Sequence, residues 1–334
     1  MKTHFFLSIM IPTMGRSEPL EKCLESLVKQ TYKNFEVVVI DGEKKSPVSS
    51  LIKKFSKNIK FKYDVQKEKG IVAAIQQGFD LAEGEIFLRT DDDIVATPNW
   101  LEEIVKTLAK DKKIAGVTGP TSMPKELHKN RDLNRFIDKM KNGEDFFWKL
   151  VGKFYFNYLM EGKPFVVGRI FKSGALSVGG PYYQPQKKDK EIIVDYLESC
   201  NWAVKRNLIL KLGGFDANFS GVGEYFENDT TTKIKKMDYK LVFNPKAQIS
   251  HHPSKAGVFS ARGKTFGRIM NFQRYYFRHI RPNNLDKIFR FLAYLAFQNA
   301  YYTYMFFTTK QKGYLESYPA SIFGIIKGIF GRFK

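Results

Sequence analysis

The sequence predicts an α/β fold with an open, mostly parallel sheet flanked by helices, followed by a helical C-terminal extension. Two observations lead to this prediction. Over the first 120 residues, apolar runs of strand length alternate with segments of helical periodicity, and in the last quarter of the chain cations and aromatic residues replace that alternation. The 334 residues, 43% of them hydrophobic, are enough to bury the core of one large or two smaller domains.

The N-terminal sequence predicts a strand and then a helix. Residues 5–11 (FFLSIMI) are apolar apart from Ser8 and stop at Pro12, a pattern typical of a strand buried on both faces of a parallel sheet. Ser17 can cap the following helix, which has Pro19 in its first turn and leucines at helical spacing. We interpret the apolar run as a core strand because it lacks the small-residue cleavage site of a signal peptide.

The same alternation continues to about residue 119. It predicts strands at 35–42, 59–65, 85–90 and 114–119, and helices at 70–84, closed by Gly84, and from Pro98 to Lys110. This βαβ spacing indicates a nucleotide-binding type of sheet, in which ligands bind beyond the carboxyl ends of the strands. Pro12, Asp41 and the acids at 91–93 all lie at such ends.

The rest of the chain is harder to order. Residues 121–190 follow no clear pattern, whereas strands and a short helix are predicted within 191–216, a helix at 228–237, and short strands at 241–243 and 247–251. We therefore expect one domain over 1–255, with a nucleotide-binding half at 1–120 and an acceptor-binding half at 121–255, and a separate helical extension over 256–334.

Charge and cysteine content narrow the setting of the protein. Lysine and arginine number 55 against 34 acids, so the formal net charge is +21. Such a surface attracts nucleotides, nucleic acid or anionic lipid, and charge alone does not distinguish them. Cys23 and Cys200 offer neither a disulfide framework nor metal-ligand spacing, so we expect a reducing, intracellular setting.

Three consecutive acids, Asp91, Asp92 and Asp93, follow the apolar run at 85–90. Neighbouring carboxylates repel one another, and a divalent cation removes that cost. Mg²⁺ and Mn²⁺ bind carboxylate oxygens and also bridge phosphates, so this turn could hold a metal-bound diphosphate. The alternative is a solvated acidic turn that caps the helix starting near Pro98.

Four stretches of the sequence resemble the inverting family 2 glycosyltransferases, which have the GT-A fold. They are "LSIMIPTMGRSEPLEKCLESLVKQTYKNFEVVVIDG" (7–42), "KGIVAAIQQGFDLAEGEIFLRTDDD" (69–93), "NWAVKRNLILKLGGFD" (201–216) and "ENDTTTKIKKMDYKLVFNPKAQISHH" (227–252). The resemblance implies transfer of a sugar from a UDP- or GDP-sugar to an acceptor hydroxyl, by a single metal-assisted displacement with a carboxylate base. A glycan or lipid-linked acceptor, in polysaccharide or glycoconjugate assembly, is the corresponding expectation.

The resemblance also assigns a nucleotide-sugar and metal site. The nucleotide-sugar contacts that it implies are Pro12, Thr13, Arg16, Asp41, Lys69, Gly70, Asp91 and Asp92. Asp93 is expected as the direct ligand of Mn²⁺ or Mg²⁺, Asp91 also counts among the metal ligands, and His251 completes the site with His252 as its competitor. Arg16 can equally be a solvated loop charge, and Asp41 a turn residue before Gly42.

The catalytic base is expected in an acidic pair at the start of a helix, where Glu227-Asn228-Asp229 stands in this chain. Counting back from Tyr239 puts Glu227 at the base position and Asp229 at the second acid, whereas side-chain chemistry favours Asp229, which we narrowly prefer. Glu224 ranks third. Either acid could instead complement the dipole of the helix.

Two further residues are implied on the acceptor side of the cleft. Asp216 belongs to the Gly-Gly-Phe-Asp stretch, and Trp202 could form a hydrophobic floor for a sugar. The competing interpretations are a capping acid and a core tryptophan.

Two other functions are weighed against sugar transfer. A sugar-1-phosphate nucleotidyltransferase would share the sheet but needs a glycine-rich loop after the first strand, and "IPTMGRSEP" has only Gly15. A nucleic-acid-binding protein would explain the charge and the stretch "RIMNFQRYYFRHIRP", but it would leave the three acids facing phosphates without purpose. We therefore expect no nucleic-acid partner.

The C-terminal part predicts contact with an anionic membrane surface. Residues 251–334 hold 14 Lys and Arg against two acids, together with 20 aromatic residues, and 321–334 could form an interfacial helix. The uncharged stretch 291–309 contains Gln298 and Asn299, which disfavour insertion. We expect a peripheral protein at the cytoplasmic face of the cell membrane; the alternative is a helical subdomain that only packs on the rest of the protein.

Overall fold

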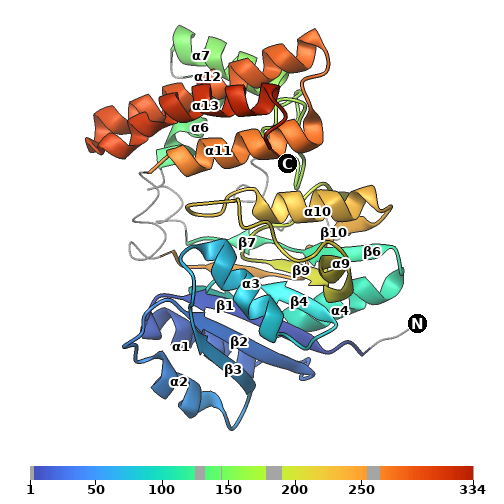
Figure 1. Ribbon diagram of the computed structural model, residues 1–334. Coiled ribbons are helices and arrows are strands. Elements are labelled where there is room, and N and C mark those ends of the chain that lie inside the picture. The colour runs from blue at the N-terminus through green and yellow to red at the C-terminus, as the bar shows by residue number, and fades with distance from the viewer. Residues whose placement is uncertain (1–3, 125–131, 144, 178–189, 254–263, 334) are drawn as a thin grey trace. The chain divides into compact units, whose positions relative to one another are not determined.

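The computed structural model describes residues 4–124, 132–143, 145–177, 190–253 and 264–333. The chain divides into two compact units (Figure 1). The first is drawn from residues 1–123, 183–218 and 226–254, and the second from 124–182, 219–225 and 255–334.

The first unit is built on an eight-stranded sheet, counted over the described residues, with the order β3-β2-β1-β4-β9-β6-β10-β8. Its strands are β1 (Leu7–Thr13), β2 (Phe35–Asp41), β3 (Lys60–Val65), β4 (Ile86–Arg89), β6 (Ile114–Thr118), β8 (Ile192–Val194), β9 (Trp202–Lys205) and β10 (Lys240–Phe243). The pairs among β1 to β4 are parallel, as is β6 with β10, whereas β9 runs antiparallel to β4 and β6, and β8 to β10. The predicted class, an α/β fold with a mostly parallel sheet, is confirmed.

Helices accompany this sheet, and all of those described except the one at Val48–Phe55 fall where the sequence predicts helices. They are α1 (Ser17–Val28), α2 (Val48–Phe55), α3 (Ile71–Leu81), α4 (Trp100–Lys110), α9 (Arg206–Lys211) and α10 (Phe226–Lys236). The predicted helix at 70–84 ends earlier, at Leu81. Gly84 serves a different purpose, because a Cβ there would lie 2.4 Å from the backbone nitrogen of Ser8, so the glycine lets the chain pass close to β1.

The first strand continues through Pro12 instead of stopping before it. Pro12 pairs with Ile40 of β2, but pairing with β4 ends at Met10 and Arg89. Residues two apart in a strand direct their backbone groups to the same side, so the missing N–H of Pro12 falls on the side where β4 no longer pairs. The strand therefore loses no ladder hydrogen bond to the proline.

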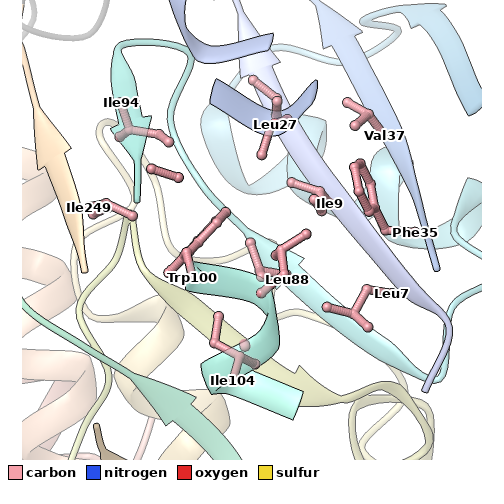
Figure 2. Close-up of a cluster of buried hydrophobic side chains, with 14 of the residues drawn as sticks. Leu7, Ile9, Leu27, Phe35, Val37, Leu88, Ile94, Trp100, Ile104 and Ile249 are labelled. Carbon is pink, nitrogen blue, oxygen red and sulfur yellow. The ribbon is translucent and has the colours of Figure 1, made fainter. Parts of the chain in front are cut away.

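Both faces of this sheet are buried, which explains the continuous apolar runs. Figure 2 shows one face, where Leu7 and Ile9 of β1 pack with Trp100 and Ile104 of α4 and with Leu27 of α1. On the alternate residues, Met10 and Ile40 approach Gly78 of α3 so closely that a Cβ at Gly78 would lie 2.6 Å from Met10 Cγ. Burial of this kind contributes about 25 cal/mol for each Å² of apolar surface.

A second, three-stranded sheet positions residues at the carboxyl edge of the large one. It consists of β5 (Ile94–Ala96), β11 (Ile249–His251) and β7 (Thr121–Ser122), in the order β5-β11-β7. Strand β11 runs antiparallel to β5, with His251 opposite Ile94. This register sets the last residue of β11 next to the acidic turn that precedes β5.

The second unit is helical in its described residues, as predicted for the C-terminal extension. It contains α6 (Asp132–Asn142), α7 (Phe146–Lys153), η1 (Phe154–Leu159), α11 (Phe266–Tyr275), η4 (Tyr276–Ile280), α12 (Leu285–Thr309), η5 (Lys312–Glu316) and α13 (Ser317–Ile329). Helices α11, α12 and α13 run alongside one another (Figure 1). None of the helices described combines the length and the apolar character needed to cross a membrane.

This unit is discontinuous, because it includes residues 124–182 and 219–225 as well as 255–334. Phe136 of α6 contacts Trp148 of α7 and also Phe297 and Tyr301 of α12, with ring centroids between 5.2 and 5.5 Å apart. The middle of the chain therefore shares one hydrophobic core with the C-terminal helices. The helical unit is therefore assembled from segments that lie far apart in the sequence.

Candidate active site

Asp91, Asp93 and His251 come together at the carboxyl edge of the sheet. Their ligand atoms all lie within 4.8 Å of one another. His251 Nε2 is 3.0 Å from Asp93 Oδ1 and 3.8 Å from Asp91 Oδ2. Two carboxylates and an imidazole suit Mn²⁺, and the carboxylates suit Mg²⁺ as well.

The state of Asp93 tests whether these residues fit a cation. Its Oδ1 atom is buried, faces His251 Nε2 at 3.0 Å and has no well-aligned hydrogen-bond donor. Burial raises the pKa of Asp93, but His251 and Arg16 lower it by more, so the net pKa is below the ordinary value and the carboxylate stays ionised. An ionised, buried oxygen that faces an imidazole nitrogen and lies close to a second carboxylate suits a divalent cation, and the site therefore fits one.

Asp92 has different partners from the acids on either side. Thr13 Oγ1 donates to Asp92 Oδ2 at 2.6 Å, Arg16 Nε donates to the same atom at 3.0 Å, and Arg16 Nη2 pairs with Oδ1. Burial raises the pKa of Asp92 to about 6, although Arg16 and Thr13 act in the opposite direction. Arg16 Nη1 also reaches Asp93 Oδ2 at 3.2 Å, so three residues predicted to contact the nucleotide fasten the loop after β1 to the acidic turn.

Asp41 organises the same loop from β2. Its Oδ1 accepts hydrogen bonds from the backbone N–H groups of Gly15 and Glu43, each at 3.0 Å, and Tyr63 donates to Oδ2 at 3.4 Å. Asp41 is fully buried. Its role as a turn residue is therefore visible in the structure, at the strand end where a nucleotide contact was predicted.

The remaining nucleotide-side residues lie at strand and helix ends. Pro12 is on β1, while Lys69 is exposed just before α3. Gly70 precedes α3 with a φ of 112°, a conformation that L side chains rarely adopt, and its carbonyl accepts a hydrogen bond from Gln66 Nε2 at 2.8 Å.

Glu227, at the start of α10, is linked to the metal cluster. Ser199 Oγ donates to Glu227 Oε1 at 2.7 Å, and Arg89 Nη1 lies 3.6 Å from the same oxygen. Arg89 Nη2 donates a hydrogen bond to Asp91 Oδ1 at 2.7 Å. Burial raises the pKa of Glu227 above the ordinary value, although Arg89 and Ser199 act to lower it.

Arg89 and Ser199 were not predicted from the sequence. The signal for Arg89 is a cation inside the apolar run at 85–90, because a buried arginine requires carboxylates nearby. No such signal exists for Ser199, which reaches Glu227 only through the fold.

The two other acids considered as the base have cationic partners. Asp229 is almost fully buried and pairs with Lys233, one turn along α10, at 2.6 Å. In the second unit, Arg268 binds Glu224 in a bidentate manner, with Nε to Oε2 and Nη2 to Oε1 both at 2.7 Å.

The structure separates the two histidines. His251 belongs to the cluster with Asp91 and Asp93, whereas His252 Nε2 lies 3.0 Å from Ser250 Oγ on an exposed side chain. Alternation of side chains along an extended segment explains why neighbours differ in this way.

The acceptor-side residues are placed as their competing interpretations describe. Trp202 on β9 is 1% exposed and packs against the rings of Phe87 and Phe215, as a core tryptophan does. Asp216 Oδ1 accepts hydrogen bonds from Asn218 N at 2.8 Å and from Asn218 Nδ2 at 2.7 Å, which closes a turn.

Comparison with known proteins identifies this domain. The family model "Glycosyl transferase family 2" matches residues 8–171. An uncharacterised glycosyltransferase of Haemophilus influenzae is 31% identical over 117 residues, which are 33% of this chain and 35% of that protein. A dolichyl N-acetyl-alpha-D-glucosaminyl phosphate 3-beta-D-2,3-diacetamido-2,3-dideoxy-beta-D-glucuronosyltransferase of Methanococcus voltae is 26% identical over 47% of this chain and 52% of its own length. These alignments therefore span about a third to a half of the relatives.

A solved structure resembles nearly the whole chain in fold. The mannosyltransferase PcManGT of Pyrobaculum calidifontis, in complex with GDP-Man and Mn²⁺, superposes with a TM-score of 0.54 at 17% identity, over 98% of this chain and 88% of the other. At that identity the likeness concerns the fold, and it agrees with the sheet described above. These findings support a glycosyltransferase whose residues 8–171 match family 2 and whose fold is of the GT-A type.

Proposed function

We propose that this protein transfers a sugar from a nucleoside diphosphate sugar to an acceptor hydroxyl, with inversion at the anomeric carbon. The observation that carries the proposal is the cluster of Asp91, Asp93 and His251 at the carboxyl edge of the sheet. In this cluster the buried Asp93 Oδ1 has no well-aligned hydrogen-bond donor. These three residues would hold Mn²⁺ or Mg²⁺. A bound cation would supply positive charge to the departing diphosphate.

Contacts within the protein support the proposed place of the donor beside the loop after β1. Thr13 and Arg16 hold the loop after β1 against Asp92, and Asp41 holds the same loop through Gly15. Because the loop is fixed before substrate arrives, less conformational freedom is lost on binding. Lys69 and Gly70, at the entry to α3, are the further proposed contacts of the nucleotide sugar.

A carboxylate must take the proton of the acceptor hydroxyl while its oxygen bonds to the anomeric carbon and the bond to the diphosphate breaks. Two contacts support Glu227 for this step. Its carboxylate is tied to Asp91 through Arg89, and it is oriented by Ser199. Asp229, the narrow preference from the sequence, is held by Lys233 and remains the alternative.

A pair of isosteric variants separates these two carboxylates. We expect Glu227→Gln to reduce turnover by about a thousandfold or more with little effect on donor affinity, because it removes the proton acceptor and keeps the shape. Asp229→Asn is the matched control and should retain most of its turnover. The readout is release of nucleoside diphosphate from a panel of UDP- and GDP-sugars. An inactive Asp229→Asn beside an active Glu227→Gln would reverse the assignment.

The acceptor and the place of action belong to the same proposal. We propose a glycan or lipid-linked acceptor, and this choice is supported by the Methanococcus voltae relative, whose name includes a dolichyl phosphate sugar. A membrane-bound acceptor would require a peripheral protein, which we place at the cytoplasmic face of the membrane. Free, buried Cys23 and Cys200 are compatible with that compartment.

A further inference from the structure

The outer side of α12 is an uncharged apolar stripe. Its exposed residues recur at helical spacing along the whole helix, and those from 289 to 307 are Phe289, Leu292, Ala296, Ala300, Tyr304 and Phe307. The exposed fraction is 63% for Phe307, 55% for Phe289 and 46% for Leu292, and it falls to 36% for Tyr304, whose ring packs beside Phe136. A contiguous exposed apolar surface is a mark of a contact with another molecule or a membrane.

Asn299, one of the polar residues that interrupt this stretch in the sequence, points away from the stripe. Asn299 is buried, and its Nδ2 donates to Leu295 O at 3.0 Å and to Ser321 Oγ of α13 at 2.8 Å. The apparent polarity of 291–309 therefore belongs to the packing between α12 and α13. The outer side of α12 is more apolar than its sequence suggests.

Helix α13 adds a second stripe next to the first. The Thr303 Oγ1 and Tyr318 OH atoms lie 2.7 Å apart at the exposed margin between the two helices. The contact of Asn299 with Ser321 is buried beneath this margin. Continuing from Tyr318 at helical spacing, Ile322, Ile326 and Ile329 are 64%, 47% and 71% exposed. The contact between Thr303 and Tyr318 joins the exposed margins of α12 and α13, so the two stripes form one surface. This surface is here called the α12–α13 face.

Cations lie beside exposed aromatic rings at the ends and margins of these two helices. Lys310 Nζ lies 5.8 Å from the ring centre of Phe307, Lys327 Nζ lies 4.7 Å from that of Phe323, and Arg332 Cζ lies 5.8 Å from that of Phe330. Within the described part of the chain, none of the three cations forms an ion pair with a carboxylate. Their charge is thus available at the edge of the apolar surface.

A neighbouring apolar surface on α7 and η1 has the same character. Phe147, Leu150 and Phe154 are exposed at helical spacing, and Lys149 and Lys153 are exposed between them. Phe154 stacks on Tyr158 at 5.4 Å, and Tyr158 contacts Phe289 at 5.7 Å, which joins this surface to the stripe on α12.

We propose that the α12–α13 face lies on an anionic lipid bilayer, with its apolar side chains among the acyl chains and Lys310, Lys327 and Arg332 at the phosphates. Isolated cations next to exposed aromatic rings are complementary to anionic headgroups above hydrocarbon. A second copy of the chain is a poorer occupant, because it would bring the same cations against these. This inference rests on the proposed function, because it names the surface by which the protein would lie on the membrane. Its test does not depend on sugar transfer.

The test measures binding of the full chain to vesicles and uses a matched pair of variants. Ile322→Glu introduces a charge in the centre of the face, and Ile193→Glu introduces the same charge on β8 of the first unit, where the isoleucine is 62% exposed against 64% for Ile322. The wild-type chain should co-sediment with phosphatidylglycerol-containing vesicles and much less with pure phosphatidylcholine. Ile322→Glu should lower the partition constant by about tenfold or more, whereas Ile193→Glu should leave it unchanged.

Three results would overturn this inference. They are no binding of the wild-type chain at low salt, equal binding of both variants and wild type, and self-association of the wild type that Ile322→Glu abolishes in size-exclusion chromatography. Binding of UDP or GDP with Mn²⁺, measured on the same samples, should be the same in Ile322→Glu and wild type. A wild-type chain that binds vesicles and no nucleotide would retain this inference and remove the proposed function.

Discussion

His251 Nε2 lies 3.0 Å from Asp93 Oδ1, although 158 positions separate the two residues in the chain. The pairing of β11 with β5, which sets His251 opposite Ile94, brings them together. The position of His251 in the site therefore depends on the pairing of β11 with β5.

Replacement of His251 should weaken metal binding selectively. We expect His251→Ala to lower the affinity for Mn²⁺ in the presence of a nucleoside diphosphate by about tenfold to a hundredfold, because it removes one of three protein ligands. His252→Ala is the control and should bind as the wild type does. The measurement is the electron paramagnetic resonance signal of free Mn²⁺, with a protein-free nucleotide sample as reference. If the two variants exchange these behaviours, His252 is the ligand.

Loss of Arg16 should destabilise the first unit. Arg16→Ala leaves the buried Asp92 without its main counter-charge, and we expect a loss of about 2–3 kcal/mol in the free energy of unfolding. Asp92→Asn in the same chain should recover part of this loss, since the uncompensated charge disappears. Urea unfolding followed by tryptophan fluorescence suits this test, because Trp100 and Trp202 are buried in that unit. A stable Arg16→Ala protein would show that the arginine is only a loop charge.

Gly119 should tolerate no side chain. A Cβ at this position would lie 1.9 Å from the carbonyl oxygen of Ala247, in the segment that leads into β11. Gly119→Ala should therefore cost about 1–3 kcal/mol of stability and, by displacing His251, weaken metal binding as well. Unfolding and Mn²⁺ titrations measure the two effects. Normal metal binding in a destabilised Gly119→Ala protein would mean that β11 adjusts without moving the histidine.

Substitutions of Trp202 test whether this residue belongs to the hydrophobic core or contacts the acceptor. Because its side chain is fully buried against Phe87 and Phe215, replacing Trp202 by alanine should cost about 3–5 kcal/mol of stability. Trp202→Phe should cost less and leave the KM for acceptor unchanged. A rise in that KM without loss of stability would restore the sugar-floor interpretation.

The sequence predicted the elements of the first unit well because their signals are local. Apolar runs such as 35–42 and helical spacing after Ser17 arise from burial on both faces of the sheet, which each segment records in its own residues. The extension of β1 through Pro12 could not be predicted, since it depends on where β4 stops pairing.

The site was predicted in part for the same reason. The acids at 91–93 are adjacent in the chain, and the structure places two of them with His251, whereas Asp92 turns out to hold Arg16 and Thr13. The contacts of Glu227 with Ser199 and Arg89 come from three distant segments, so no local pattern announces them. The shared core of α6, α7 and α12 is non-local in the same sense.

The central claim, metal-dependent binding of a nucleoside diphosphate at Asp91, Asp93 and His251, is tested most directly by calorimetric titration of UDP and GDP in Mn²⁺ and in EDTA. The wild-type chain should bind one of the two in Mn²⁺ and at least about tenfold more weakly in EDTA. Asp93→Asn should bind equally weakly in both, while Asp238→Asn, a change at an exposed acid, should match the wild type. Equal affinity of the wild type with and without metal, or an Asp93→Asn protein that retains metal-dependent binding, would contradict the account.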